Sequence, residues 1–574
     1  MTDMRRTVLW VVFLASLFML WDGWQKHNGH PSFFAPPPPK AVTNTANGTA
    51  PASSAPAPAT AGAAMAAATA ASAPAVGEKV VVTTDVLTVT FDTLGGDVTR
   101  VELPKYKAAH LDPSLFDPLL QAVGLRKKPE GDLGSTVLLD AAHGYKAQSG
   151  FVGTAGEQLP THLTPMTLVS TDRALKDGAD ALTVRLESAP VGGIKLVKTY
   201  TLKRGSYVID MKDEIANTGD KPVTPQAYVQ LVRDASAAPG ASGYYSTFTG
   251  PAVYNGKYHK VEFKKLDKDG GDMEKLDIDK SAQAGWVAMV QHYFASAWLH
   301  NDAGAREFFV KPLAGTAPQQ YAVGMVFTMP PLAAGASTTR SDQLFVGPQE
   351  ENDLEKIAPG LELVKDYGIF AVISKPLFWL LDNLHKAIGN WGWAIIALVV
   401  LLKIAFYWLN ARAYTSMAKM KAINPKVQAL RERLKDKPQE MQQEMMKIYR
   451  DEKVNPIGGC LPIFVQMPVF IGLYWVLLSS VEMRGAPWLG WIHDLSVPDP
   501  FFILPILMTI SSLFQVWLQP TPPDPTQAKM MWFMPLAFSF MFFSFPAGLT
   551  LYYVVNNVLT IAQQWIINKR LGAN

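Results

Sequence analysis

Residues 395–410 read IIALVVLLKIAFYWLN, a strongly apolar run that contains one charged residue, Lys403. A stretch of this length and hydropathy predicts a helix that spans a membrane. A charge inside such a helix is costly, so it is usually kept for a function. Comparable stretches follow, and we expect five spans near the C-terminus: 391–409, 457–480, 501–519, 530–545 and 549–568.

The composition of the 574-residue chain limits the class of protein. The length exceeds that of one ordinary domain. Hydrophobic residues make up 48% of the chain, which fits a water-soluble part joined to membrane segments. A net charge of +3 gives no global argument for nucleic-acid binding. The single cysteine excludes an internal disulfide framework and a cysteine-built metal site.

The N-terminal segment predicts a sixth span. Arg5 and Arg6 precede an apolar run, and no small-x-small cleavage site follows it directly. We therefore expect an uncleaved signal anchor over 1–25 with its N-terminus in the cytoplasm. Residues 26–76 are rich in proline and alanine and cannot build a core, so they predict a linker.

Residues 77–360 have the texture of β-structure. The runs KVVVTTDVLTVTF (79–91) and IKLVKTYTLKRGSYVIDMKDEIANTG (194–219) alternate apolar and polar residues and are bounded by turn formers. Strand signals over this length predict one large antiparallel β-sandwich. The segment carries no nucleophile motif, no HExxH and no Gly-rich phosphate loop. We expect a binding or scaffold domain, with no catalytic residue, cofactor or metal.

Residues 361–390 link this domain to the first C-terminal span. If these residues form a helix, its apolar residues lie on one side, and Pro376 interrupts it. This pattern favours an amphipathic helix in the membrane interface. A packed helix of the soluble domain is the alternative.

Lysine and arginine predict the orientation in the membrane. Residues 410–455 carry eleven of them, whereas 481–500 carry one. With six spans and the N-terminus inside, the basic segments fall in the cytoplasm and the β-domain falls outside. We therefore expect a multi-pass protein of a bacterial inner membrane with a periplasmic β-domain.

The basic segment over 410–455 predicts a cytoplasmic helical hairpin with a turn near Pro438. Flexible methionines can fit varied apolar partners, so the expected contact residues are Met417, Met420, Met441 and Met445. Its basic residues could also meet lipid phosphate or ribosomal RNA. An ordinary antiparallel helix pair with solvated charges explains the same periodicity.

Lys403 has no acidic partner within the predicted membrane segments, because none of the five C-terminal spans contains Asp or Glu. Gln466 supplies a polar group from another span. The last span carries polar side chains at spacings of three and four, which places them on one helical face: Tyr553, Asn556, Thr560 and Gln563. This pattern favours a hydrated cavity open to the cytoplasm. Snorkelling of Lys403 to the lipid headgroups is the alternative.

Three functions remain open for the chain, two of which use such a cavity. A polar peptide segment could cross the bilayer there, since a hydrated recess lowers its desolvation cost. A solute transporter or channel is a second possibility, although intramembrane carboxylates and inverted repeats are missing. Thirdly, the sandwich could bind carbohydrate, with the spans as its anchor.

Four motifs closely resemble the YidC family of bacterial membrane protein insertases. They are YTSMAKMKAINPKVQALRERL (414–434), EKVNPIGGCLPIFVQMPVFIGLYW (452–475), WIHDLSVPDPFFILPILM (491–508) and FPAGLTLYYVVNN (545–557). The resemblance covers the whole layout, from an N-terminal span through a periplasmic β-domain to five spans.

The resemblance implies an insertase and chaperone, not an enzyme. Such a protein helps inner-membrane proteins insert and fold, alone or with the SecYEG translocon and its accessory proteins. It also implies a groove open to cytoplasm and lipid, with Lys403 at a place usually held by arginine and Tyr553 in contact with substrate. The partners implied are nascent membrane proteins, lipids, the Sec translocon and the ribosome.

Three departures from the family pattern change the expectations. Lysine at 403 keeps the charge of arginine but loses its bidentate geometry. Tyr407–Trp408 replaces a tyrosine–proline pair, so we expect a straighter helix. The sequence lacks a long basic tail after Asn568, which makes direct ribosome contact less expected.

Overall fold

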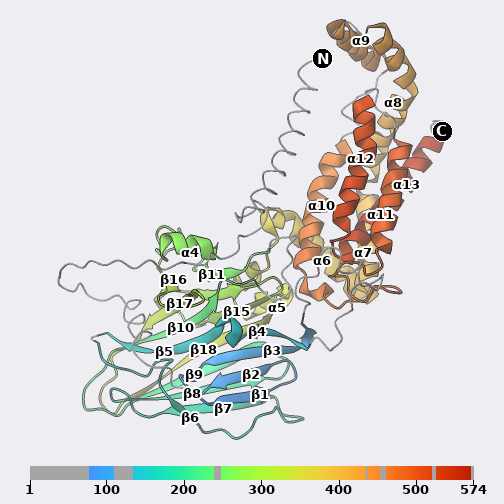
Figure 1. Cartoon of the computed structure of the whole chain (residues 1–574). Coiled ribbons are helices and arrows are strands. Elements are labelled where there is room, and N and C mark those ends of the chain that lie inside the picture. The colour runs from blue at the N-terminus through green and yellow to red at the C-terminus, as the bar shows by residue number, and fades with distance from the viewer. Residues whose placement is uncertain are drawn as a thin grey trace.

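The computed structural model describes residues 77–108, 134–154, 156–237, 247–434, 437–452, 461–519 and 525–570. The predicted signal anchor over 1–25 and the linker over 26–76 lie outside these ranges. Two parts are evident in Figure 1, a β-rich part and a group of elongated helices that rises from one side of it.

The β-rich part consists of two antiparallel sheets. The first has the order β1-β2-β3-β5-β10-β17-β16-β13, with β4 paired to β3. Its strands are β1 (Lys79–Thr83), β2 (Thr88–Asp92), β3 (Val98–Lys107), β4 (Ser135–Leu139), β5 (Lys146–Gly153), β10 (Pro225–Asp234), β13 (Ser281–Ala282), β16 (Arg306–Leu313) and β17 (Gln320–Thr328).

The second sheet has the order β12-β11-β14-β15-β18-β9-β8-β7-β6. Its strands are β6 (Met166–Leu168), β7 (Ala181–Ser188), β8 (Ile194–Lys203), β9 (Val208–Asn217), β11 (Gly250–Tyr254), β12 (Tyr258–Lys260), β14 (Trp286–Val290), β15 (Phe294–Leu299) and β18 (Ser337–Pro348).

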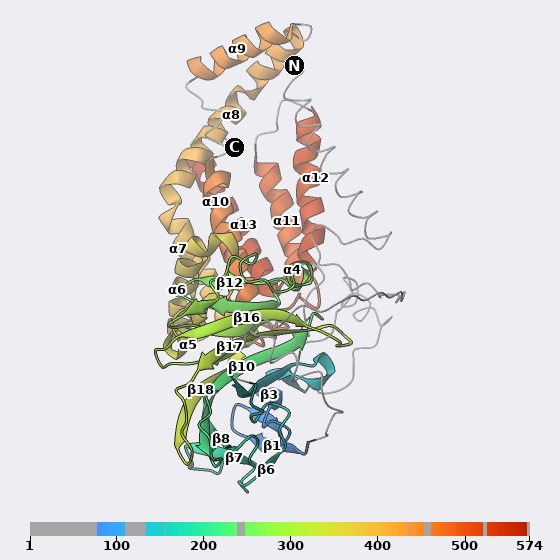
Figure 2. The same ribbon diagram turned by 90° about the vertical axis from the view of Figure 1, so that its left-hand side faces the viewer.

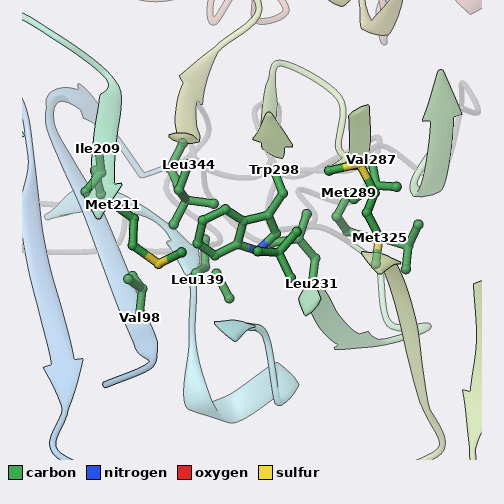
Figure 3. Close-up of a cluster of buried hydrophobic side chains, with 14 of the residues drawn as sticks. Val98, Leu139, Ile209, Met211, Leu231, Val287, Met289, Trp298, Met325 and Leu344 are labelled. Atoms are coloured by element: carbon green, nitrogen blue, oxygen red, sulfur yellow. The ribbon is translucent and has the colours of Figure 1, made fainter. Parts of the chain in front are cut away.

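The sheets face each other across a common apolar core, because alternate residues of each strand point inward. In β8, every second residue is buried: Ile194, Leu196, Lys198, Tyr200 and Leu202. Trp298 of the second sheet lies at the centre of the core close-up (Figure 3), and its Nε1 donates to the carbonyl of Gln230 in the first sheet at 3.0 Å. The predicted antiparallel β-sandwich is confirmed.

Helices make up the rest of the described chain. A short helix, α4 (Phe263–Asp269), lies beside the sandwich, and α5 (Glu351–Ile357) follows the last strand. The remaining helices are α6 (Ala371–Ile388), α7 (Trp391–Ala405), α8 (Tyr407–Arg433), α9 (Pro438–Asp451), α10 (Leu461–Ser479), α11 (Ile503–Leu518), α12 (Pro525–Phe542) and α13 (Ala547–Arg570).

Five of these helices, α7 and α10 to α13, run side by side around a second apolar core (Figures 1 and 2). Ile395 and Leu398 of α7 meet Leu473 of α10 and Leu551 of α13 in this core. Local sequence determines the turn between α6 and α7, where this group of helices begins. Gly389 closes α6 in a left-handed conformation (φ 79°), and the side chain of Asn390 accepts from the amide of Trp393 to start α7.

α6 has the exposed apolar residues expected of a helix at an interface. It buries Leu377 and Leu381 against its neighbours. Val372 and Trp379 are nevertheless 86% and 67% exposed. A helix with apolar groups on both faces fits a position between protein and lipid.

The predicted straight helix through Tyr407–Trp408 is wrong. α7 ends at Ala405, and α7 and the first half of α8 meet at an angle of 68°. Phe406, at φ −93° and ψ 10°, lies outside the helical region, so the backbone bends there without a proline, although the Phe406 N–H still donates to the carbonyl of Leu402. Within the described residues, no single helix is long and apolar enough to cross a membrane, but this bent pair is.

Candidate functional site

The polar site predicted around Lys403 forms between α7 and α13. The Lys403 ammonium donates to Oγ1 of Thr560 at 2.7 Å, and that hydroxyl donates to the carbonyl of Asn556 at 2.6 Å. Thr560 is buried, whereas Lys403 is half-buried. Three residues of the predicted set therefore come together, although Asn556 contributes its backbone here.

Lys403 has unused hydrogen-bonding capacity. Its ammonium carries three N–H donors, and Thr560 is its hydrogen-bond partner among the residues that the structure describes. No ion pair to Lys403 occurs in the same residues. The site can therefore offer two further donors to water or to a ligand.

A second level of the site is aromatic and lies nearer the sandwich. Tyr553 precedes Thr560 by seven residues, roughly 10 Å along the axis of α13. Its half-buried ring packs against Phe470 of α10 and Phe542 of α12, with centroids 4.9 and 4.7 Å apart. The predicted groove residues thus occupy two levels, one charged and one aromatic.

Gln466 joins the aromatic level through a residue that the sequence argument missed. Its Nε2 donates to the hydroxyl of Tyr552 at 2.9 Å. Adjacent residues of a helix point about 100° apart, so Gln466 contacts Tyr552 and not the predicted Tyr553, although both rings pack against Phe470. Asn557, next to the predicted Asn556, faces α11 and donates to Ser511 and Ser512 at 3.1 and 2.9 Å.

Polar contacts also flank the bend between α7 and α8. Lys403, two residues before the end of α7, contacts Thr560 of α13, and Nε2 of Gln563 in α13 lies 3.5 Å from the carbonyl of Tyr407, just after the bend. α13 thus contacts both sides of the bend.

The methionines of the helical pair α8–α9 are less exposed than a free contact surface would be. Met441 is buried, and Met417, Met420 and Met445 are half-buried. The most open methionine of the pair is Met446, at 51% exposure. Packing between α8 and α9 therefore accounts for Met441.

Within the described residues, no group of His, Cys, Asp or Glu side chains could hold a metal ion. The chemistry of the site is that of a cation, hydroxyls, amides and aromatic rings.

Two family models together match most of the chain. The YidC periplasmic domain matches residues 79–380, and the 60Kd inner membrane protein model matches residues 383–574. The chain belongs to the YidC family. The first match covers the β-sandwich and the segment that follows its last strand, and the second covers the helices that form the Lys403 site.

Relatives of similar length carry the family name. A membrane protein insertase YidC of Ralstonia nicotianae is 52% identical and covers 100% of this chain and 99% of its own. One from Cupriavidus necator is 51% identical over 99% of this chain and 98% of its own. A crystal structure described as an active YidC insertase covers 85% of this YidC-family chain and 94% of its own, with 18% identity and a TM-score of 0.36.

Proposed function

We propose that this chain is a membrane protein insertase that receives a polar segment of a nascent membrane protein at Lys403. The contact that carries the proposal is the Lys403–Thr560 hydrogen bond, which fixes the ammonium while leaving donors for a ligand. Family membership supports an insertase over a solute transporter or channel, which was the alternative from sequence.

The physical role of Lys403 is to lower the cost of a polar segment inside the membrane. An unpaired ammonium in hydrocarbon is very unfavourable. Its unused donors are therefore satisfied by water until substrate replaces that water. Carbonyl groups and carboxylates of a translocating tail are suitable acceptors, and no step requires nucleotide or metal.

The aromatic level suits the apolar part of the substrate. Tyr553, Phe470 and Phe542 offer ring faces and edges to a hydrophobic helix. We infer that a substrate's transmembrane helix passes along these rings into lipid while its polar tail is held near Lys403.

The wider assignment extends this proposal to the whole chain. Six spans, counting 1–25, place the N-terminus and the α8–α9 pair in the cytoplasm and the sandwich in the periplasm. α8 and α9 then meet nascent chains through exposed groups such as Met446. Lipids, the Sec translocon and the ribosome are the proposed further partners.

Insertion by purified protein in liposomes tests the charge. For a substrate with an acidic translocated tail, Lys403→Met is expected to reduce insertion on the order of tenfold, the factor that corresponds to loss of one charge-assisted hydrogen bond. Lys403→Arg should retain most activity. Lys569→Met removes a charge at the exposed end of α13 and is the matched control. Wild-type activity of Lys403→Met would refute the proposed role.

A further inference from the structure

The segment that leaves α10, residues 478–484, is held by the sandwich on several sides, and we call it the joint. Its first contact is apolar. Val481 is 1% exposed and belongs to the core of the sandwich, although it follows a helix of the other part. The domain core thus includes a residue from the C-terminal half of the chain.

A buried ion pair fixes the same segment. The Lys365 ammonium lies 3.0 and 3.2 Å from the two carboxylate oxygens of Glu482. The side chain of Lys365 is fully buried and that of Glu482 is 17% exposed. The ammonium also lies 3.8 Å from the ring centroid of Phe378 in α6. Separation of these groups would leave a buried charge unpaired, which is strongly unfavourable. The ion pair therefore fixes the position of Glu482 relative to Lys365.

A turn and a strand of the sandwich contact the two ends of the joint. Nε2 of His292, in the β14–β15 turn, donates to the carbonyl of Leu478 at 2.8 Å. Arg484 donates to the carbonyl of Lys107 at the end of β3 at 2.6 Å, and its guanidinium lies 5.4 Å from the ring centroid of Phe294. Figures 1 and 2 show the lower ends of the helices next to this side of the sandwich.

α10 connects the joint to the candidate site. Ser374 of α6 donates to the carbonyl of Gly472 at 3.1 Å and braces the middle of α10. Farther along, Phe470 meets Tyr553 and Gln466 meets Tyr552. Pro468 lies inside α10 between Phe470 and Gln466, whereas no proline separates Phe470 from the joint, so the position of the joint sets the position of Phe470.

We propose that the sandwich positions one wall of the insertion site through this joint, with Lys365 and Glu482 as positioning residues. Domains joined within one chain are usually free to move relative to each other. Here the apolar insertion of Val481, the buried ion pair and the bonds at both ends of the joint oppose that motion. The orientation claim stands alone, whereas its consequence for insertion rests on the proposed function.

Distance measurements on the full chain in lipid nanodiscs test the orientation. Spin labels are placed at exposed Thr183 in β7 and exposed Leu489 after the joint, with Cys460 replaced by serine. Wild type is expected to give one narrow distance distribution. Glu482→Gln should broaden it, and the exchange Lys365→Glu with Glu482→Lys should narrow it again. Asp353→Asn, which removes an exposed ion pair with Lys356, is the matched control and should change nothing.

A narrow distance distribution in Glu482→Gln would refute the claim that this ion pair fixes the orientation of the sandwich. If that variant does not fold, Arg484→Met at the half-buried end of the joint replaces it, with the same criterion. Insertion is measured on the same samples and is expected to fall at least fivefold in the broadened variants and to recover in the exchange. Broadening with unchanged insertion would overturn the positioning role. If the wild-type protein does not insert substrate, the proposed function is refuted. The distance measurements would still show whether the joint fixes the orientation of the sandwich.

Discussion

Three lysines of this chain lie away from bulk water and are stabilised in different ways. Lys198, inside the sandwich, donates to the carbonyls of Gly95 and Ser149 and to the Ser149 hydroxyl, which uses all three N–H groups. Lys365 meets a carboxylate. Lys403 has one hydroxyl among the described residues. This comparison separates structural lysines from one that retains donors for a ligand.

Thr560 is therefore expected to matter through its hydroxyl. Thr560→Val keeps the shape of the side chain but removes the acceptor for Lys403. Insertion of an acidic-tailed substrate should fall on the order of fivefold, the factor that about 1 kcal/mol provides. Thr560→Ser should retain activity. The double variant with Lys403→Met should be no worse than Lys403→Met alone; additive losses would mean that the two residues act independently.

Sequence spacing could predict part of the site. Lys403 and Thr560 were identifiable because a charge and a polar helical face stand out in apolar spans. Residue spacing did not predict the hydrogen bond between Gln466 and Tyr552. Which of two adjacent tyrosines a neighbouring helix contacts depends on how the two helices are rotated relative to each other. That rotation arises from packing over the whole group of helices and is not encoded in one helix.

At the scale of elements, the bend at Phe406 predicts tolerance of proline nearby. Trp408 is the second residue of α8, where a backbone N–H has no helical acceptor. Trp408→Pro should therefore change stability by no more than about 1 kcal/mol. Leu401→Pro, at an exposed position inside α7, should cost roughly 3 kcal/mol. Thermal unfolding of both variants in detergent compares them, and equal losses would show that the bend is not an independent helix start.

Elements differ in how well sequence predicts them. The strands around Ile194 and Ile209 follow a period of two because one face of each is buried, so local pattern suffices. The joint is different. Lys365 and Glu482 are 117 residues apart and each resembles an ordinary loop charge. Only the structure shows that they form a buried ion pair.

At the scale of the whole molecule, buried acids make the stability of the sandwich depend on pH. Burial raises the pKa of Asp97 from 3.8 to about 7 and that of Asp213 from 3.8 to about 6, although Lys198 opposes both shifts. These two carboxyl groups thus bind more protons in the folded state than in the unfolded state between pH 4 and 7, whereas His162 and His292, whose pKa values burial lowers to about 3 and about 4, bind fewer below pH 6.5. The contribution of Asp97 to stability is therefore expected to fall as pH rises across this window, by up to roughly 4 kcal/mol, while the two histidines contribute in the opposite direction.

Replacement of Asp97 by asparagine tests this directly. Asn keeps the acceptor for Gln148, which donates to Asp97 at 2.7 Å, but cannot ionise. Asp97→Asn should remove the fall in unfolding free energy that Asp97 causes as pH rises, and should make the sandwich more stable than wild type at pH 8, where the buried carboxylate is ionised. Asp353→Asn, at an exposed carboxylate, should leave the curve unchanged. Denaturant unfolding of the full chain at pH 4.5, 6 and 8, followed by tryptophan emission, measures the effect. An unaltered slope in Asp97→Asn would mean that Lys198 keeps Asp97 ionised throughout.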